Sequence, residues 1–283
     1  MVVDYAIVGL KFSTQDATKT AKAAEVLHGT GSMSQQVPSL PIFPTLIEAL
    51  RSARYVVVLT GAGISAESSI PTFRDAQTGL WAKYSPQELA TPQAFRRNPK
   101  LVWEWYAWRR ELVAQAKPNP GHLALAELEQ LVPLFTLITQ NVDGLHQRAG
   151  SRNVIELHGN IKRTKCFEQG HMVDSWDETG EIPPRCPKCN SYLRPDVVWF
   201  GESLPRQALA DAFAAAEQCD LFLSIGTSAL VHPAASLPAV ALERGTITVE
   251  INPDSTPLTP RVTYTLQGPA GQVLPNLIAT LQG

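Results

Sequence analysis

A glycine-rich turn directly after an apolar run carries the clearest chemical signal in the sequence. Residues 55–60 form the run Tyr-Val-Val-Val-Leu-Thr, and Gly61-Ala-Gly63-Ile-Ser-Ala66 follows at once. This spacing fits G-x-G-x-x-G/A, in which two glycines permit a tight turn beside a pyrophosphate and a small third residue lets a helix pack closely. A turn of this kind can also be purely structural. The acidic residue expected about 20 positions further on is missing, because residues 68–75 have a loop pattern, and this disfavours a hydride-transferring dehydrogenase.

Polar residues follow three further predicted strands. The segments are Gln140-Asn-Val-Asp143, Gly226-Thr-Ser228 and Asn252-Pro-Asp254. In a parallel sheet the carboxyl ends of the strands share one edge, which is where such sheets bind ligands. Any one of these segments could be plain turn chemistry, since Asn, Asp, Gly and Ser are common turn residues. Together with the Gly61 turn they favour a binding site at that edge.

His158 stands at the same edge, directly after the predicted strand 154–157 and before Gly159. A histidine in this place can be a structural hydrogen-bonding residue. It can also act as a general base, because imidazole titrates near neutral pH. Its position beside the other polar segments makes His158 the candidate base.

The elements that position these residues alternate between short apolar strands and amphipathic helices. The predicted strands are 55–60, 134–139, 154–157, 221–225, 246–251 and 262–266, and the predicted helices are 45–52, 121–131, 206–218, 233–243 and 272–281. This alternation predicts an α/β fold, with a Rossmann-like parallel sheet and helices on both faces. Two stretches interrupt it: residues 84–117 have a helical pattern with clustered aromatics, and residues 161–193 are rich in Cys, Pro and Gly. Both are expected to be insertions that form a smaller domain.

Composition excludes several functional classes. The 283 residues contain 24 Lys and Arg against 26 Asp and Glu, without a run of five like charges, which argues against nucleic-acid binding. The apolar runs fall far short of the roughly 18 to 20 residues that span a bilayer, so no membrane association is expected. Four cysteines, with Cys186 and Cys189 spaced as metal ligands, indicate a reducing compartment, and a cytoplasmic location is predicted.

Several long motifs together resemble one family, the sirtuins, which are NAD-dependent protein lysine deacylases. The motifs begin at Gly61 (GAGISAESSIPTFRD), Thr139 (TQNVDGLH), Leu157 (LHGN), Val197 (VVWFGE) and Gly226 (GTS). They occur in the family's order, and the resemblance runs from about Ile47 to the C-terminus. It implies one catalytic domain over residues 41–283, with a Rossmann-like core (41–83, 118–160 and 194–283), a helical insertion (84–117) and a zinc-ribbon-like insertion (161–193). Residues 1–40 are then expected to be a leader, either disordered or the result of a start assigned upstream of Met33.

The resemblance also assigns roles to matching positions. It implies that His158 is the general base and that Asn141, at the nicotinamide end with Asp143, is the second catalytic residue. The backbone of Val198, Phe200 and Gly201 is expected to pair with the substrate peptide. The implied NAD-binding residues are Gly61, Ala62, Gly63, Phe73, Arg74, Gln140, Asn141, Asp143, Gly226, Ser228, Asn252 and Ala270. The implied products are free lysine, nicotinamide and O-acyl-ADP-ribose.

An acyl preference follows from three positions in and beside the helical insertion. Ala90, Tyr106 and Arg109 match the acyl pocket of the sirtuin subgroup that removes succinyl and malonyl groups. Tyr106 and Arg109 are three apart, so on a helix they share one face. They could instead line a wet surface, as most Arg residues do. The neighbouring Arg110 lies on another face, and its substitution is expected to change little.

Zinc is where the sequence departs from the family pattern of two C-x2-C pairs. Cys186 and Cys189 form the second pair, but the first has only Cys166, with Gln169 where its partner would fall. His171 could complete a Cys3His site, which zinc accepts, or it could be a solvent-exposed loop residue beside an absent or weakly held metal. The predicted ligands are therefore Cys166, His171, Cys186 and Cys189, whereas Cys219 is expected to be a small core residue.

Two alternatives to a deacylase acting on acylated lysine remain open from the sequence. The same NAD site would serve a protein mono-ADP-ribosyltransferase, which needs no acyl-lysine. A non-enzymatic NAD-sensing or zinc-ribbon interaction module is disfavoured, because a pure binder has no use for a base at the nicotinamide end. The oligomeric state cannot be predicted.

Overall fold

The computed structural model describes residues 42–71, 83–177 and 180–283. The predicted leader, residues 1–40, lies outside these ranges. Among the helices in these ranges, none combines the length and the apolar composition that a membrane span requires.

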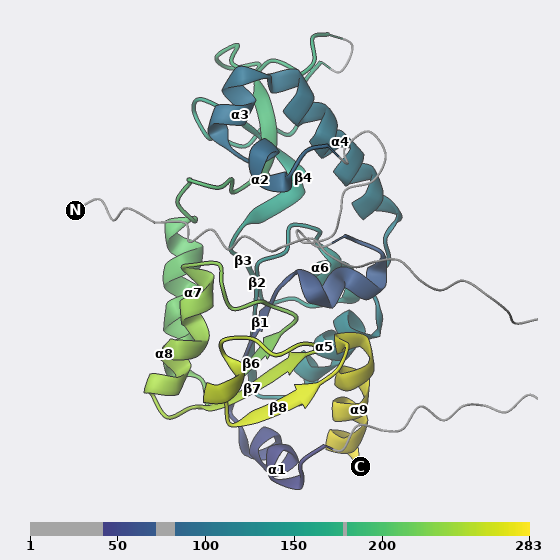
Figure 1. Ribbon diagram of the computed structural model, residues 1–283, viewed down its shortest axis with the longest axis vertical. Coiled ribbons are helices and arrows are strands. Elements are labelled where there is room, and N and C mark those ends of the chain that lie inside the picture. Colours follow the sequence, from purple (N-terminus) through teal and green to yellow (C-terminus); the bar gives the residue numbers. More distant parts are fainter. Residues whose placement is uncertain (1–41, 72–82, 178–179) are drawn as a thin grey trace, which may run out of the picture. The chain divides into compact units, whose positions relative to one another are not determined.

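All six predicted strands form one parallel sheet (Figure 1). In spatial order they are β3 (Val154–Glu156), β2 (Leu134–Thr139), β1 (Tyr55–Thr60), β6 (Leu221–Ile225), β7 (Ile247–Asn252) and β8 (Tyr264–Gln267). Every neighbouring pair of these described strands is parallel. Chain order reverses at β1, which lies between β2 and β6. Such a reversal is where open α/β sheets bind ligands, outside the carboxyl ends of the strands.

Helices cover both faces of the sheet because its strands are apolar on both sides. Val56 and Val58 of β1 pack in the core beneath α1 (Pro44–Ser52), α5 (Pro120–Leu131) and α9 (Ala270–Gln282). Val57 and Leu59 face the opposite way, toward α7 (Arg206–Gln218) and α8 (Leu237–Glu243). Figure 1 shows α7 and α8 together on one side of the strands and α5 and α9 on the other. The predicted doubly covered parallel sheet is confirmed.

The helical insertion consists of α2 (Pro86–Leu89), α3 (Pro92–Arg97) and α4 (Pro99–Gln115). Local capping sets the starts of the last two, since the Thr91 and Asn98 side chains accept hydrogen bonds from Ala94 N and Leu101 N. Proline in the first turn fits both starts.

A second, two-stranded sheet was not predicted. It pairs β4 (Gly159–Cys166) with β5 (Leu193–Val197) in antiparallel fashion. Arg110 of α4 is joined to β4, because its guanidinium donates to Ile161 O at 2.7 Å and to Thr164 Oγ1 at 3.0 Å. Arg110 therefore attaches the helical insertion to the small sheet, a role its place in the sequence does not reveal.

Short helices complete the described chain. The turn after β1 is the 3-10 helix η1 (Ala62–Ser68), and α6 (Leu145–Ala149) follows β2. The helix predicted for 233–243 is divided into η3 (Ala234–Ser236) and α8, and η4 (Thr259–Arg261) precedes β8. The subdivision of the chain into domains remains a prediction.

Candidate active site

The glycine turns after β1 and β6 are in direct contact. Gly63 N donates to Gly226 O at 2.8 Å, and Gly61 N donates to Ile225 O at 3.0 Å. Gly226 has φ +58°, and a Cβ there would lie 2.5 Å from Ile64 N. Glycine is required at this crossing by both conformation and space. The Gly61 turn thus contacts a second loop of the predicted NAD site.

The residues that follow β2 join the same loops. Asn141 is buried, and its Nδ2 donates to Gly61 O and to Ser65 Oγ, each at 3.1 Å. Gln140 Nε2 donates to Thr227 Oγ1 at 3.0 Å. Side chains from three strand ends therefore meet at one place, as the sequence predicts.

Asp143 is the buried anion of this cluster, with 4% of its surface exposed. Its Oδ2 accepts from Ser65 Oγ at 2.8 Å, and its Oδ1 accepts from Leu145 N at 2.9 Å. Burial raises the pKa of the Asp143 carboxyl, and the two hydrogen bonds oppose this shift. A buried carboxylate with fixed partners suits a site that orients a polar group of a ligand.

Ser65 and His122 belong to this network but were not singled out from the sequence. Asn119 N donates to His122 Nδ1 at 3.3 Å, so the His122 proton is on Nε2, which lies 3.4 Å from Ser65 Oγ. Ser65 can then accept from His122 and Asn141 while donating to Asp143. The available signals were the position of Ser65 inside the glycine turn and the Asn119-Pro-Gly-His122 helix start.

His122 packs against a second buried histidine, His146, with ring centroids 4.9 Å apart. Burial lowers the pKa of His122 to about 4, and burial together with His122 lowers that of His146 to about 3. His146 Nε2 lies 3.0 Å from Thr60 Oγ1, and its buried Nδ1 has no partner among the described residues. Both rings are therefore neutral at pH 7 and support the cluster without adding charge.

His158 is held in the tautomer that a general base needs. Its Nδ1 lies 2.8 Å from Gln140 O, and since a carbonyl only accepts, Nδ1 carries the proton and Nε2 keeps its lone pair. Burial lowers the pKa of His158, and the bond to Gln140 opposes that shift. The ring is neutral at pH 7 and can accept a proton at Nε2.

The remaining predicted NAD residues lie at the same edge where the structure describes them. Asn252, at the end of β7, donates to Thr227 O at 2.9 Å, and Ser228 follows Thr227. Ala270 is buried at the start of α9, and Ala62 begins η1. Glu67 of η1 accepts from Gly271 N at 2.7 Å, which connects the glycine turn to α9. Phe73 and Arg74 lie outside the described residues.

The predicted peptide segment runs beside His158. Val198 N donates to His158 O, and Phe200 N donates to Ala90 O, each at 2.9 Å. Phe200 and Gly201 are exposed, and Gly201 has φ +86° with open space around it. The N–H groups of Val198 and Phe200 already donate to carbonyls. A substrate peptide that adds a strand here would have to use other backbone groups or displace these bonds.

Ala90 and Tyr106, two of the predicted acyl-pocket residues, lie in one buried cluster with Trp199. Burial raises the pKa of Tyr106 to about 12, although the positive charge of Arg109 opposes the shift. Burial lowers the pKa of Arg109, and Tyr106 and Asp143 oppose this change. Arg109 also stacks on Trp105, with its guanidinium carbon 5.0 Å from the ring centroid.

Three cysteines, one at the end of β4 and two in the segment between β4 and β5, form a cluster. The Sγ atoms of Cys166, Cys186 and Cys189 lie within 4.8 Å of one another. His171 is not part of this trio, but its Nε2 lies 3.3 Å from Cys186 Sγ. Ser191 Oγ lies 3.0 Å from Cys166 Sγ. Thiol and imidazole donors so close together fit zinc. Cys219 is buried in the core beside α7, as predicted.

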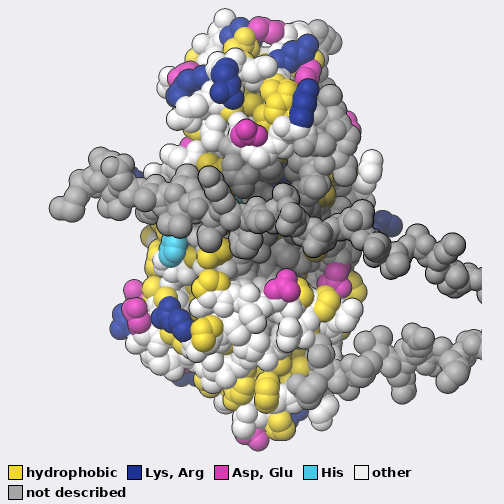
Figure 2. Space-filling model, viewed as in Figure 1, with side chains coloured by type: hydrophobic (Ala, Val, Ile, Leu, Met, Phe, Trp, Pro, Cys, Tyr) yellow, Lys and Arg dark blue, Asp and Glu magenta, His cyan; other side chains and the backbone are white. Residues whose placement is uncertain are grey.

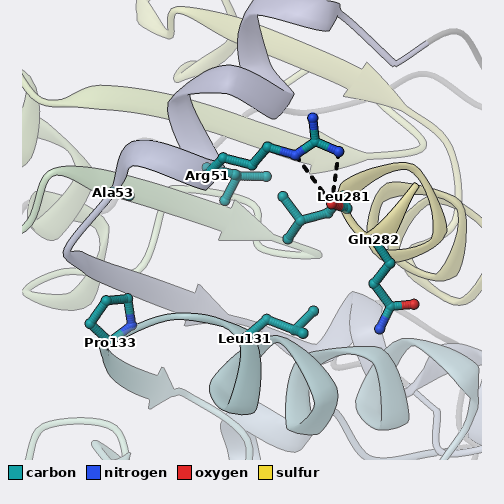
Figure 3. A pocket seen from close by; sticks show the side chains of 7 residues that line it. Arg51, Ala53, Leu131, Pro133, Leu281 and Gln282 are labelled. Atoms are coloured by element: carbon teal, nitrogen blue, oxygen red, sulfur yellow. Dashed lines mark hydrogen bonds between the residues drawn. The ribbon is translucent and has the colours of Figure 1, made fainter.

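A shallow pocket lies at the opposite edge of the sheet from the candidate site (Figure 3). It is lined by Leu50, Arg51, Ala53, Leu131, Pro133, Leu281 and Gln282. Arg51 donates twice to Leu281 O, at 3.3 and 3.1 Å, which caps the end of α9. Ala53 lies two residues before β1 and Pro133 one residue before β2, so this pocket lies at the amino ends of the strands, away from the candidate site.

Comparison with known proteins supports the same interpretation. The family model described as Sir2 family matches residues 61–233. The NAD-dependent protein deacylase of Aquifex aeolicus (strain VF5) is 58% identical over 205 residues, which are 72% of this chain and 85% of that protein. NAD-dependent protein deacylase 1 of Pseudomonas aeruginosa (strain PAO1) is 51% identical over 241 residues, covering 82% of this chain and 96% of that protein.

Solved structures agree with the fold. A Sir2 homolog in complex with NAD has a TM-score of 0.80 at 50% identity, covering 86% of this chain and 95% of that chain. A Sir2–p53 peptide–NAD+ structure has a TM-score of 0.75 at 34% identity, covering 84% of this chain and 97% of that chain.

Proposed function

Since the chain belongs to the Sir2 family and is an NAD-dependent protein-lysine deacylase, we propose that it prefers lysines that carry succinyl or malonyl groups and also removes acetyl groups. The products would be free lysine, nicotinamide and O-acyl-ADP-ribose. Bound NAD would supply a ribose carbon to which the acyl oxygen bonds as the bond to nicotinamide breaks, and one water would be consumed overall to release the free lysine.

Each of the site residues would then have a separate role in the reaction. Asn141 and Asp143 would orient the nicotinamide end, because both are buried and held by Ser65. His158 Nε2 would accept the proton of a ribose hydroxyl as that hydroxyl attacks the acyl carbon. The glycine turns at Gly61 and Gly226 would let the phosphates approach the backbone closely. The N–H groups of Gly61, Gly63 and Gly226 already donate to carbonyls, so neighbouring N–H groups at the start of η1 and in the Gly226 loop would bind the phosphates.

The acyl preference rests on one observation: Tyr106 and the small Ala90 share one buried cluster, and the charge of half-buried Arg109 is close enough to Tyr106 to oppose the rise in its pKa. A guanidinium presents a fork that fits a carboxylate, and a phenol adds one more donor. Succinyl and malonyl groups end in a carboxylate, whereas acetyl offers no anion. A partner lost from a buried charge pair costs about 2 to 5 kcal/mol, or roughly 30-fold to several thousand-fold.

Substitution of Arg109 tests this preference. Arg109→Met should lower kcat/KM for a succinyl-lysine peptide by at least about 30-fold and leave the acetyl-lysine value unchanged or higher. Lys100→Met is the matched control, since Lys100 lies on the same helix with its side chain 65% exposed. Equal losses on both peptides would mean that Arg109 supports the fold or the NAD site, and the acidic-acyl proposal would be withdrawn.

The two alternative activities are separated by mass spectrometry of the reaction with NAD and acylated peptide. O-acyl-ADP-ribose supports deacylation. ADP-ribose attached to protein, without that product, indicates mono-ADP-ribosyl transfer. A lack of NAD consumption would indicate a binding module.

For zinc, we propose that His171 completes a structural site with Cys166, Cys186 and Cys189. The support is the contact of its Nε2 with Cys186 Sγ at 3.3 Å. Closed four-ligand sites of this type stabilise small loop-rich modules. Metal analysis of the purified protein should give about one zinc per chain, and His171→Ala should lower that content. Full zinc in His171→Ala would remove His171 alone from the site, whereas zinc well below one per chain in the wild type would remove the site.

A further inference from the structure

Trp199 contacts Tyr106 of the proposed acyl pocket. We infer that Trp199 is a positioning residue that sets the preference for acyl groups ending in a carboxylate. It would do so by fixing the direction of the Tyr106 hydroxyl. This inference rests on the proposed acyl preference, and its test separates the two.

The first step is the hydrogen bond between the two side chains. Trp199 Nε1 donates to the Tyr106 hydroxyl oxygen at 2.9 Å. An indole nitrogen can only donate, so the phenol is the acceptor, and its single hydrogen must point to another group. A carboxylate is an acceptor without hydrogens, which makes it the matching ligand. An acetyl methyl group cannot accept that hydrogen.

The direction of the Tyr106 hydroxyl hydrogen affects binding because both side chains are buried. Trp199 is 1% exposed and Tyr106 is 2% exposed. In such surroundings a hydroxyl that lacks its partner is costly, and so is a carboxylate that lacks a donor. The pKa of Tyr106, raised to about 12 by burial, keeps the phenol protonated and able to donate at any working pH.

The Trp199 ring itself is firmly held. The guanidinium carbon of Arg194 lies 3.3 Å from the ring centroid, and Phe95 packs with its ring centroid at 5.3 Å. Arg194 is 3% exposed and forms two bonds to Glu202, at 2.5 and 2.9 Å. Glu202 also accepts from the Trp199 backbone N at 2.7 Å. Both the ring and its backbone are therefore fixed, and with them the direction of the indole N–H.

The position of Trp199 also links two parts of the substrate site. Its neighbours Val198 and Phe200 belong to the predicted peptide segment, and they bond to His158 and Ala90. The side chain of Trp199 reaches from that segment to Tyr106 on α4. One residue thus connects the segment that would hold the peptide with the hydroxyl that would recognise its acyl group.

The test is a double-mutant cycle read as a ratio of kcat/KM values for succinyl-lysine and acetyl-lysine peptides. Trp199→Phe keeps an aromatic ring against Arg194 and removes the donor together with part of the ring volume. It should lower the ratio of the succinyl to the acetyl kcat/KM about threefold to tenfold, mainly through the KM for the succinyl peptide. Tyr106→Phe should lower the succinyl value about tenfold or more, because it removes a bond to a charged group. In the Tyr106→Phe background, Trp199→Phe should change the ratio no further.

A control variant and the pattern of losses on the two peptides test the positioning role of Trp199. Trp103→Phe, the same substitution at a tryptophan of α4 that does not bond to Tyr106, is the control and should leave the ratio unchanged. Because both peptides are assayed on one preparation, partial unfolding of a variant cancels from the ratio. Equal loss on both peptides, or an additional effect of Trp199→Phe when Tyr106 is already Phe, would overturn the positioning role. A ratio unchanged in Tyr106→Phe and Arg109→Met would instead overturn the acyl preference itself.

Discussion

The buried pair His122 and His146 should make the protein sensitive to mild acid. Both folded pKa values, about 4 and about 3, lie below the ordinary value of about 6.5, so the folded state binds fewer protons than the unfolded state. The stability contributed by the neutral rings is therefore fully present above about pH 6.5 and is lost as the pH falls toward 4. Between pH 7 and pH 5, protonation of the unfolded state alone lowers the free energy of unfolding by about 2 kcal/mol per histidine, or about 4 kcal/mol for the pair.

The assay is urea unfolding at pH 7 and pH 5, followed by circular dichroism. His146→Gln keeps a donor for Thr60 but cannot take up a proton in this range, so its loss of stability between the two pH values should be smaller than that of the wild type by about 2 kcal/mol. His232→Gln is the control, because His232 is exposed and its ring bonds only to Ser236 among the described residues. If His122→Gln and His146→Gln both keep the full pH dependence of the wild type, the buried neutral pair is refuted.

Three further predictions follow from the contacts at and around the site. Gly226→Ala should raise the Kd for NAD about tenfold or more, because its Cβ would lie 2.5 Å from Ile64 N; calorimetric titration with NAD measures this Kd, and wild-type affinity would contradict the prediction. His158→Gln should lower kcat/KM by about 10² to 10⁴ with NAD affinity retained, and wild-type kcat/KM in that variant would contradict the base. Because burial lowers the pKa of His158, the fall of wild-type kcat/KM on the acid side should begin below the pH at which an ordinary histidine titrates. Arg110→Met should lower the free energy of unfolding by about 1 to 3 kcal/mol, since it removes the bonds to β4; denaturant unfolding measures it, and wild-type stability would show that those bonds contribute little.

The main sheet was predictable because its signals are local. Continuous apolar runs such as residues 55–60 and 221–225 form strands buried on both faces, and the polar segments at their ends gather at one edge. The position of His158 beside that edge followed from the same rule. The edges of elements shifted by one or two residues, as at β8.

The small sheet was not predictable from periodicity. β4 contains Asn, Arg and two Lys, and its alternation is broken by an irregular register between Asn160 and Thr164. Its burial comes from packing against α4 and the cysteine cluster. Those contacts are tertiary and leave no repeat in the sequence.

The hydrogen-bond networks around the site were also not predictable from the sequence. Trp199 and Tyr106 are separated by 93 positions and Ser65 and Asp143 by 78, so no local pattern relates them. Arg110 shows the same limit, because its helical position does not reveal that three groups of β4 surround its guanidinium. The sequence motifs identified the candidate residues, but their hydrogen-bond partners could be identified only from the fold.

The central claim is tested most directly by giving the wild-type protein NAD with peptides that differ only in a succinyl or an acetyl group on one lysine. Mass spectrometry then follows nicotinamide and the ADP-ribose product. The account predicts O-succinyl-ADP-ribose, formed in equal amount to nicotinamide, with a kcat/KM for the succinyl peptide at least about 30-fold above that for the acetyl peptide. Equal or higher efficiency on the acetyl peptide would contradict the role given to Tyr106 and Arg109, and NAD consumption without any O-acyl-ADP-ribose would contradict deacylation.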